Sequence, residues 1–183
     1  HALEDAENEL TWEMRELFAE QRDEITILHE RIAEFTKRIE RYSQSVAPCK
    51  ALSGIHGVGP IGAALLYISL GDGKSFTNGR QASACIGLTP KQFSTGGKVS
   101  LYGIGKRGNR RLKSVLIRGA LSVIRALGDK QDKLSCWLRA LIERSCINNA
   151  AVALANKIAR TAWSMLRNEK DYDAEFVGVE ELA

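Results

Sequence analysis

A 3.5-residue hydrophobic repeat near the start of the chain constrains the fold more than any other feature of the sequence. Apolar residues recur at alternating steps of four and three from Met14 to Val46, and Gln21 is the only polar member of the series. The two sets of heptad positions are Met14, Gln21, Leu28, Phe35 and Tyr42, and Phe18, Ile25, Ile32, Ile39 and Val46. A seam held over this many heptads is typical of a coiled coil, so we predict one long helix over residues 5–46.

Such a helix needs a partner for its apolar seam. About forty helical residues span roughly 60 Å, which is too long for a small domain to bury by itself. The seam therefore predicts a homodimer or a higher oligomer through residues 5–46, or pairing with a helix from chain outside these residues. The alternative is a helix packed along its own domain. Pro48 cannot continue the helix, so we assign residues 1–47 to a coiled-coil linker and dimerisation segment.

Residues 48–170 predict a compact helical domain, and the whole chain is expected to be all-α. Glycine-rich turns separate the helices that we expect over 52–70 (two short helices), 80–86, 109–127, 130–144 and 150–167. Asn148 and Asn149 are the expected N-cap of the last helix. Residues 88–108 predict an ordered loop with room for a hairpin around Thr95 to Lys98, and we see no convincing strand pattern. Residues 171–183 form an acidic tail that we expect to be disordered.

Composition excludes several classes of protein. The 183 residues are 44% hydrophobic and 26% charged, which is globular rather than disordered. We see neither a membrane span nor a secretory signal, so we expect a cytoplasmic protein, bacterial or archaeal. The four cysteines contain no CxxC pair. We therefore expect reduced, small buried apolar cysteines and no metal site in this chain.

The net charge of +4 hides a strong segregation along the sequence. Residues 1–46 carry six basic and twelve acidic residues, whereas residues 47–170 carry twenty basic and five acidic ones. The last thirteen residues carry five acidic residues and no basic one. Between Asp72 and Asp129 there are eleven Lys or Arg and no acidic residue. Segregation on this scale indicates a polyanionic partner, and nucleic acid is the first candidate.

The segment over 52–70 is similar to a helix-hairpin-helix motif. Gly57 and Gly59 allow a tight turn with a close backbone approach, and Pro60 is well placed to begin the second helix. Backbone N–H groups at that helix start can bind a phosphate without reading base sequence. The alternative is a plain corner between two helices.

A second constellation, over 88–111, combines a hydroxyl with positive charge. Ser94 lies beside Thr95-Gly96-Gly97. Seven basic residues near it in the sequence are candidates for binding phosphate: Lys91, Lys98, Lys106, Arg107, Arg110, Arg111 and Lys113. A serine can attack phosphorus when neighbouring arginines neutralise the phosphoryl oxygens. From the residues alone, a turn serine and a phosphate-binding basic cluster are the simpler interpretation.

Three longer strings favour the catalytic interpretation: GIHGVGPIGAALL, IGLTPKQFSTGGKVSLYGIGKRGNRRLKSVLIRGA and AVALANKIARTAWSML. They resemble, in order, the C-terminal domain of DEDD-type insertion-sequence transposases, which are relatives of the pilin-gene invertases and include bridge-RNA-guided recombinases. The resemblance covers roughly residues 50–168. It implies that Ser94, twelve residues before Lys106, is the nucleophile that becomes joined to DNA, and that Lys106, Arg107, Asn109 and Arg110 form the basic motif. Gly105 stands where many members have Ser.

The resemblance also implies parts that this sequence lacks. Family members carry four acidic residues on a RuvC-like N-terminal domain that hold Mg²⁺, so we expect no cofactor in these residues, Mg²⁺ with the missing domain, and little activity from this chain alone. DNA is the expected partner, a structured guide RNA is a further one, and no membrane is expected. The rival interpretation is a non-catalytic helix-hairpin-helix module that binds nucleic acid and dimerises through the coiled coil.

Overall fold

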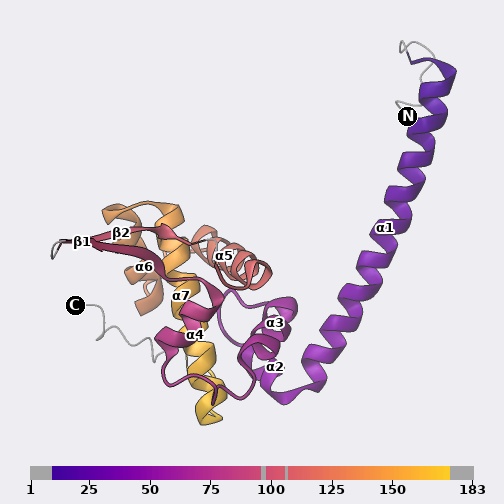
Figure 1. The fold of residues 1–183 in the computed structure, drawn as a ribbon. Helices are drawn as coiled ribbons and strands as arrows, with labels where there is room; N and C mark the ends of the chain where they lie inside the picture. The colour runs from indigo at the N-terminus through magenta and orange to yellow at the C-terminus, as the bar shows by residue number, and fades with distance from the viewer. Residues whose placement is uncertain (1–9, 96–97, 106, 174–183) are drawn as a thin grey trace. The chain divides into compact units, whose positions relative to one another are not determined.

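The computed structural model describes residues 10–95, 98–105 and 107–173, and over 93–102 it describes the backbone alone. Helices dominate, which confirms the mostly helical fold class (Figure 1). The described helices are α1 (Trp12–Ser45), α2 (Ala47–Leu52), α3 (Pro60–Leu70), α4 (Gly79–Ile86), α5 (Arg110–Arg125), α6 (Lys133–Arg144) and α7 (Ile147–Asn168). Two short strands, β1 (Pro90–Thr95) and β2 (Lys98–Ile104), lie between α4 and α5.

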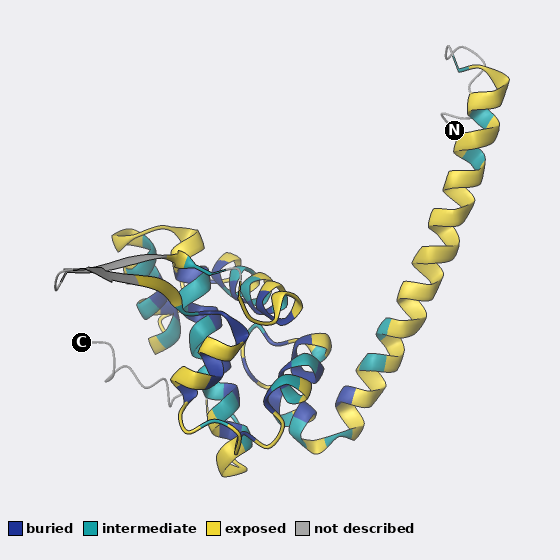
Figure 2. Cartoon of the chain, in the orientation of Figure 1, coloured by how far each residue is buried: buried dark blue, intermediate teal, exposed yellow. Residues whose placement is uncertain are grey.

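Contacts divide the chain into a first unit over 1–41 and a second unit over 42–183. In the first unit, α1 forms over nearly all of the predicted range, and residues 1–9 lie outside the described part. Most of α1 is exposed (Figure 2). At the heptad positions, Phe18 is 43% exposed, Ile25 52% and Ile32 61%. Among the described residues of this unit nothing covers these side chains, and the coiled coil stays a prediction.

The second unit is built around α7. One side of this helix is lined by small residues that let its neighbours approach closely: Ala150, Ala151, Ala155, Ala159 and Ala162 are all fully buried. Leu154 and Ile158 fill the spaces between them. Helices α2, α3, α4, α5 and α6 all contact α7, so one helix supplies the centre of a single core.

Helix ends are set by side chains that accept backbone hydrogen bonds. Asn78, Asn109 and Asp132 cap α4, α5 and α6 respectively, each accepting from the backbone N–H three residues on. The Ser135 hydroxyl and amide both donate to Asp132, which lowers the pKa of that carboxyl. The expected start of α6 at 130 was wrong because Asp132 begins the helix at Lys133.

Three other sequence expectations need correction. The first short helix lies over Ala47–Leu52 and ends where we expected it to begin, because Pro48 starts a new helix rather than only ending the old one. Helix α7 begins at Ile147, so Asn148 and Asn149 lie in its first turn and Cys146 is the N-cap. Only Cys49 is buried; the other cysteines are exposed, and all four are free thiols.

The segment over 88–108 contains strands, contrary to the expectation of none. β1 and β2 pair in antiparallel register, with Thr95 opposite Lys98, and the register shifts between Pro90 and Lys91. The hairpin expected around Thr95 to Lys98 is therefore confirmed, although Gly96 and Gly97 lie outside the described residues. The pattern was hard to recognise because glycine and lysine interrupt the alternation typical of strands.

Two glycines bring the turn after α2 against the middle of α5. Gly57 has a φ of +85°, and a Cβ there would lie 2.9 Å from the carbonyl oxygen of Gly119. A Cβ on Gly119 would lie only 1.9 Å from the carbonyl oxygen of Gly57. Only glycine at both positions allows the two backbones to approach this closely.

Replacing Gly119 by Ala tests this contact. Ala exceeds Gly in helix propensity by about 1 kcal/mol, so an isolated helix would gain stability. Here the added methyl group meets the Gly57 carbonyl, and we expect a net loss of about 1–3 kcal/mol in the free energy of unfolding, measured with urea. Ser122→Ala, on the exposed side of α5, is the matched control and should stay within about 0.5 kcal/mol. Unchanged stability in Gly119→Ala would contradict the contact.

Candidate active site and nucleic-acid interface

The predicted nucleophile lies in the hairpin. Ser94 is the fifth residue of β1 and pairs with Val99 of β2, while Lys98 begins β2 opposite Thr95. Lys106 lies outside the described residues. The structure therefore places Ser94 on a strand of the hairpin, within the segment that we expected to be an ordered loop with room for a hairpin.

The base of the hairpin, residues 86–89 and 104–109, is fixed by a second pair of glycines. Gly87 and Gly108 both have φ near +90°, a region that glycine adopts readily. A Cβ on Gly87 would lie 2.0 Å from the carbonyl oxygen of Arg107, and one on Gly108 would lie 2.5 Å from that of Ile86. The chain entering the hairpin thus touches the chain leaving it. The position of the basic motif is thereby tied to the end of α4.

Lys113 holds the outgoing side of the hairpin base. Its side chain is buried, and its ammonium donates to the carbonyl oxygens of Gly105 at 2.7 Å and of Arg107 at 3.4 Å. A buried ammonium needs such acceptors because desolvating it without partners is costly. In this structure Lys113 positions the loop that carries Arg107, and the nucleic-acid contact predicted for Lys113 stays a prediction.

Asn109 also has a structural role. Its side-chain oxygen accepts from the Leu112 amide at 3.1 Å, which caps α5, and its side-chain nitrogen donates to the Ser69 hydroxyl at 3.3 Å. On the other side of the hairpin base, Asn156 of α7 donates to the carbonyl oxygen of the buried Leu88 at 3.1 Å. The base is therefore anchored to α3, α5 and α7.

Four of the predicted basic residues are exposed at the hairpin base, and we call them the basic cluster: Lys91, Arg107, Arg110 and Arg111. The aliphatic stem of Lys91 lies along Gly105, whose Cβ position is 3.4 Å from Cε of the lysine. None of the four forms an ion pair within the described residues. Four unneutralised cations next to the predicted nucleophile's strand make a surface suited to phosphate groups.

The turn between α2 and α3 contains Gly57 and Gly59, and the helix-hairpin-helix assignment of this segment stays a prediction. Gly57 serves the contact with α5 described above. Gly59 is the N-cap of α3, is exposed, and provides no side-chain cap for the first amides of the helix. A phosphate contact at this turn stays a prediction.

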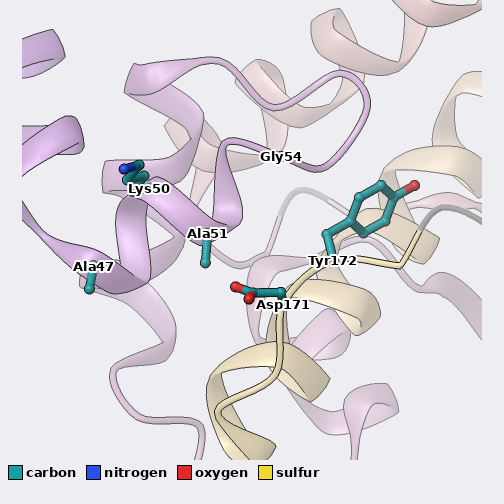
Figure 3. A pocket seen from close by; sticks show the side chains of 6 residues that line it. All are labelled: Ala47, Lys50, Ala51, Gly54, Asp171 and Tyr172. Carbon is teal, nitrogen blue, oxygen red and sulfur yellow. The ribbon is translucent and has the colours of Figure 1, made fainter.

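A separate open depression of about 500 Å³ lies beside α2 and the turn that follows it (Figure 3). Its lining residues are Ala47, Lys50, Ala51, Gly54, Asp171 and Tyr172. The Tyr172 hydroxyl lies 3.3 Å from Nδ1 of His56, and burial is the main cause that raises the pKa of the tyrosine. The depression contains none of the predicted site residues. The depression lies between the segment after α7 and α2 with its following turn.

Sequence reasoning missed Gly87 and Asn156, and it named Lys113 as a phosphate contact without its positioning role. These roles depend on contacts with backbone far away in the fold, which no local pattern predicts, although Gly119 inside a helical pattern was a readable signal. Among the described residues, no group of three His, Cys, Asp or Glu side chains could hold a metal ion. No described helix is long and apolar enough to cross a membrane.

Comparison with known proteins shows what the segment that carries these features is similar to. Residues 49–135 match the sequence profile described as "Transposase IS116/IS110/IS902 family". Residues 49–135 are therefore similar to this transposase family, and we call them the matched segment. The matched segment includes most of α2, all of α3 to α5, the glycine turn, the hairpin and the basic cluster, and it ends early in α6.

Relatives with similar sequences extend the likeness over most of the chain. A "Probable family 20 transposase" of Pseudomonas aeruginosa is 42% identical over 159 residues, covering 87% of this chain and 47% of the relative. The "Transposase for insertion sequence element IS1111A" of Coxiella burnetii is 43% identical over 143 residues, covering 78% and 39%. The corresponding transposase for IS1328 of Yersinia enterocolitica is 38% identical, covering 74% and 41%. This chain thus spans less than half the length of each.

Lys113→Met tests the positioning role assigned to Lys113 at the hairpin base. Methionine has a similar volume but cannot donate to the two loop carbonyls, so we expect faster amide exchange over 98–113, by about tenfold or more. The free energy of global unfolding should change by less than about 1 kcal/mol, because a buried charge is replaced by a packed apolar chain. Hydrogen–deuterium exchange measures this, with exposed Lys130→Met as control. Unchanged exchange over 98–113 would contradict the role.

Proposed function

We propose that this chain is the serine-bearing part of a DNA transposase or site-specific recombinase, and that Ser94 is its nucleophile. The observation that carries the proposal is the position of Ser94 in the β1–β2 hairpin of the matched segment, with the exposed basic cluster fixed at the hairpin base. The names of the relatives, all transposases, support the reaction class.

The proposed reaction is an attack on a DNA phosphodiester. Oγ of Ser94 bonds to phosphorus, the bond from phosphorus to one DNA oxygen breaks, the serine loses its proton, and the departing oxygen gains one. The phosphodiester energy is conserved in the phosphoserine, so a second DNA oxygen can reverse the step and rejoin strands. Arg107, Arg110 and Arg111 would stabilise the charge on the phosphoryl oxygens.

Magnesium stays an expectation that comes from the family resemblance. The described residues do not form a carboxylate cluster that fits the ion. We therefore derive no step through the metal from this chain. If the acidic domain implied by the resemblance supplies Mg²⁺, the ion would belong to that domain and not to the hairpin base.

A purely binding role is the second candidate. The start of α3, which has no side-chain cap, and the basic cluster, which forms no ion pair with any described residue, favour phosphate contacts whether or not Ser94 reacts. The same surface could hold a structured guide RNA, since charge alone does not separate the two polymers. Catalysis is distinguished from binding by a covalent adduct.

Ser94→Ala in the full-length protein tests the nucleophile. We expect the substitution to abolish a protein–DNA adduct that survives denaturing electrophoresis, while the affinity for DNA stays within about twofold, because only the attacking oxygen is lost. The DNA should carry a nick near the cleaved bond so that the adduct accumulates. Ser100→Ala, in the opposite strand β2, is the matched control and should keep the adduct. An adduct formed by Ser94→Ala, or none formed by the wild type, would overturn the assignment.

We further propose that α1 forms a coiled coil with a second copy of the chain. The exposed seam supports this, because Ile25, Leu28 and Ile32 are each about half exposed and follow the heptad spacing. Equilibrium sedimentation at tens of micromolar should give a dimer or a larger assembly. Ile32→Glu should shift the chain to monomer by placing a charge in the seam, whereas Arg31→Glu, beside the seam, should not. A wild-type monomer would contradict the proposal.

A further inference from the structure

The exposed side of α5 carries a row of arginines that begins in the basic cluster, at Arg111, and continues along the helix. Arg111, Arg118 and Arg125 are spaced seven residues apart, which is just under two helical turns, so they lie along one side of the helix. Ser114 and Ser122 are also exposed and fill the same side. We call these five residues the arginine stripe. It runs roughly 21 Å along α5, calculated from the helical rise.

No carboxylate neutralises the stripe within the described residues. Its three arginines take part in none of the ion pairs, and α5 contains no acidic residue. Exposed helices usually alternate charges at spacings of three and four, which stabilises them modestly. A row of like charges without that compensation favours an anionic partner that is itself extended.

The rest of α5 makes the stripe rigid. Leu112, Leu116 and Ala120 are fully buried on the side that packs on α7. A third side meets the turn at Gly57 through Gly119. Because the helix is held on two sides, the arginines project from a fixed support rather than from a loop.

The start of α3 adjoins the stripe. A Cβ on Gly62, in the first turn of α3, would lie 3.5 Å from Cγ1 of Val115, and Val115 is three residues before Arg118. The first amides of α3 have no side-chain cap, and Gly59 leaves the space in front of them open. Uncapped helix amides accept phosphate oxygens, so they add to the same charge preference.

We propose that the arginine stripe binds the phosphate backbone of duplex DNA and continues the basic cluster away from the hairpin. This inference rests on the proposed DNA-binding function and adds Arg118 and Arg125 to its surface. A track of roughly 21 Å spans about six phosphates of one strand along the duplex axis. Contacts to phosphates fix the position of the DNA and do not select its sequence.

The test is a salt series with the full chain and a labelled duplex of random sequence. Arg118→Gln with Arg125→Gln removes two charges and keeps good helix formers. Lys133→Gln with Arg144→Gln, on exposed positions of α6, removes two charges elsewhere and is the matched control. Each lost phosphate contact reduces the slope of log affinity against log salt by about 0.9, so the stripe variant should lose nearly 2 from the slope. When the salt concentration falls from 1 M to 0.1 M, the affinity of the stripe variant should therefore rise about sixtyfold less than that of the wild type.

The outcomes separate the inference from the proposed function. A reduced slope in the stripe variant alone, with thermal unfolding like that of the wild type, supports the stripe. Equal losses in stripe and control variants, or no loss in either, overturn the stripe while DNA binding stands. A wild type without affinity for duplex DNA overturns the proposed function itself. A loss seen only with a structured RNA of the same length overturns duplex DNA as the occupant.

Discussion

The close approach of backbones at two pairs of glycines determines how the helical unit over 42–183 is assembled. Gly57 against Gly119 holds the turn after α2 on the middle of α5, and Gly87 against Gly108 holds the two ends of the hairpin together. A single methyl group at any of these contacts would meet a carbonyl group. These contacts carry little energy by themselves. They matter because one pair places the turn before α3 on the middle of α5, and the other places the hairpin base beside the start of α5.

An excess of positive charge is the second property that the structure depends on. The part of the chain without acidic residues, between Asp72 and Asp129, includes α4, the hairpin and all of α5. Its cations divide into two kinds. Lys113 is buried and bonded to carbonyl oxygens, so it organises the backbone, whereas the exposed arginines have no carboxylate partner among the described residues. Folding therefore divides the positive charges into a buried lysine that holds the backbone in place and exposed arginines that are accessible to phosphate groups.

Much of the architecture was readable from local patterns. The heptad repeat predicted α1, apolar periodicity predicted α5 and α7, and the fold class followed. Helix starts were less predictable because several residues compete for each cap. Asn148 and Asn149 are good N-cap residues, yet α7 begins before them, since packing of Ala150 and Ala151 in the core extends the helix. The strands were missed because their pairing, not their residues, stabilises them.

The sequence by itself determined the helical fold, the long seam and the charge segregation, because each depends on residue type and spacing along the chain. Ser94 became the candidate nucleophile only through the family resemblance. Only the tertiary structure decided what Asn109 and Lys113 do, since a cap and a buried ammonium look like exposed polar residues until their acceptors are placed. The arginines of α5 likewise became one surface only when the helix direction and its buried sides were known. Which cations face solvent depends on contacts between residues far apart in the sequence, and no local pattern contains those contacts.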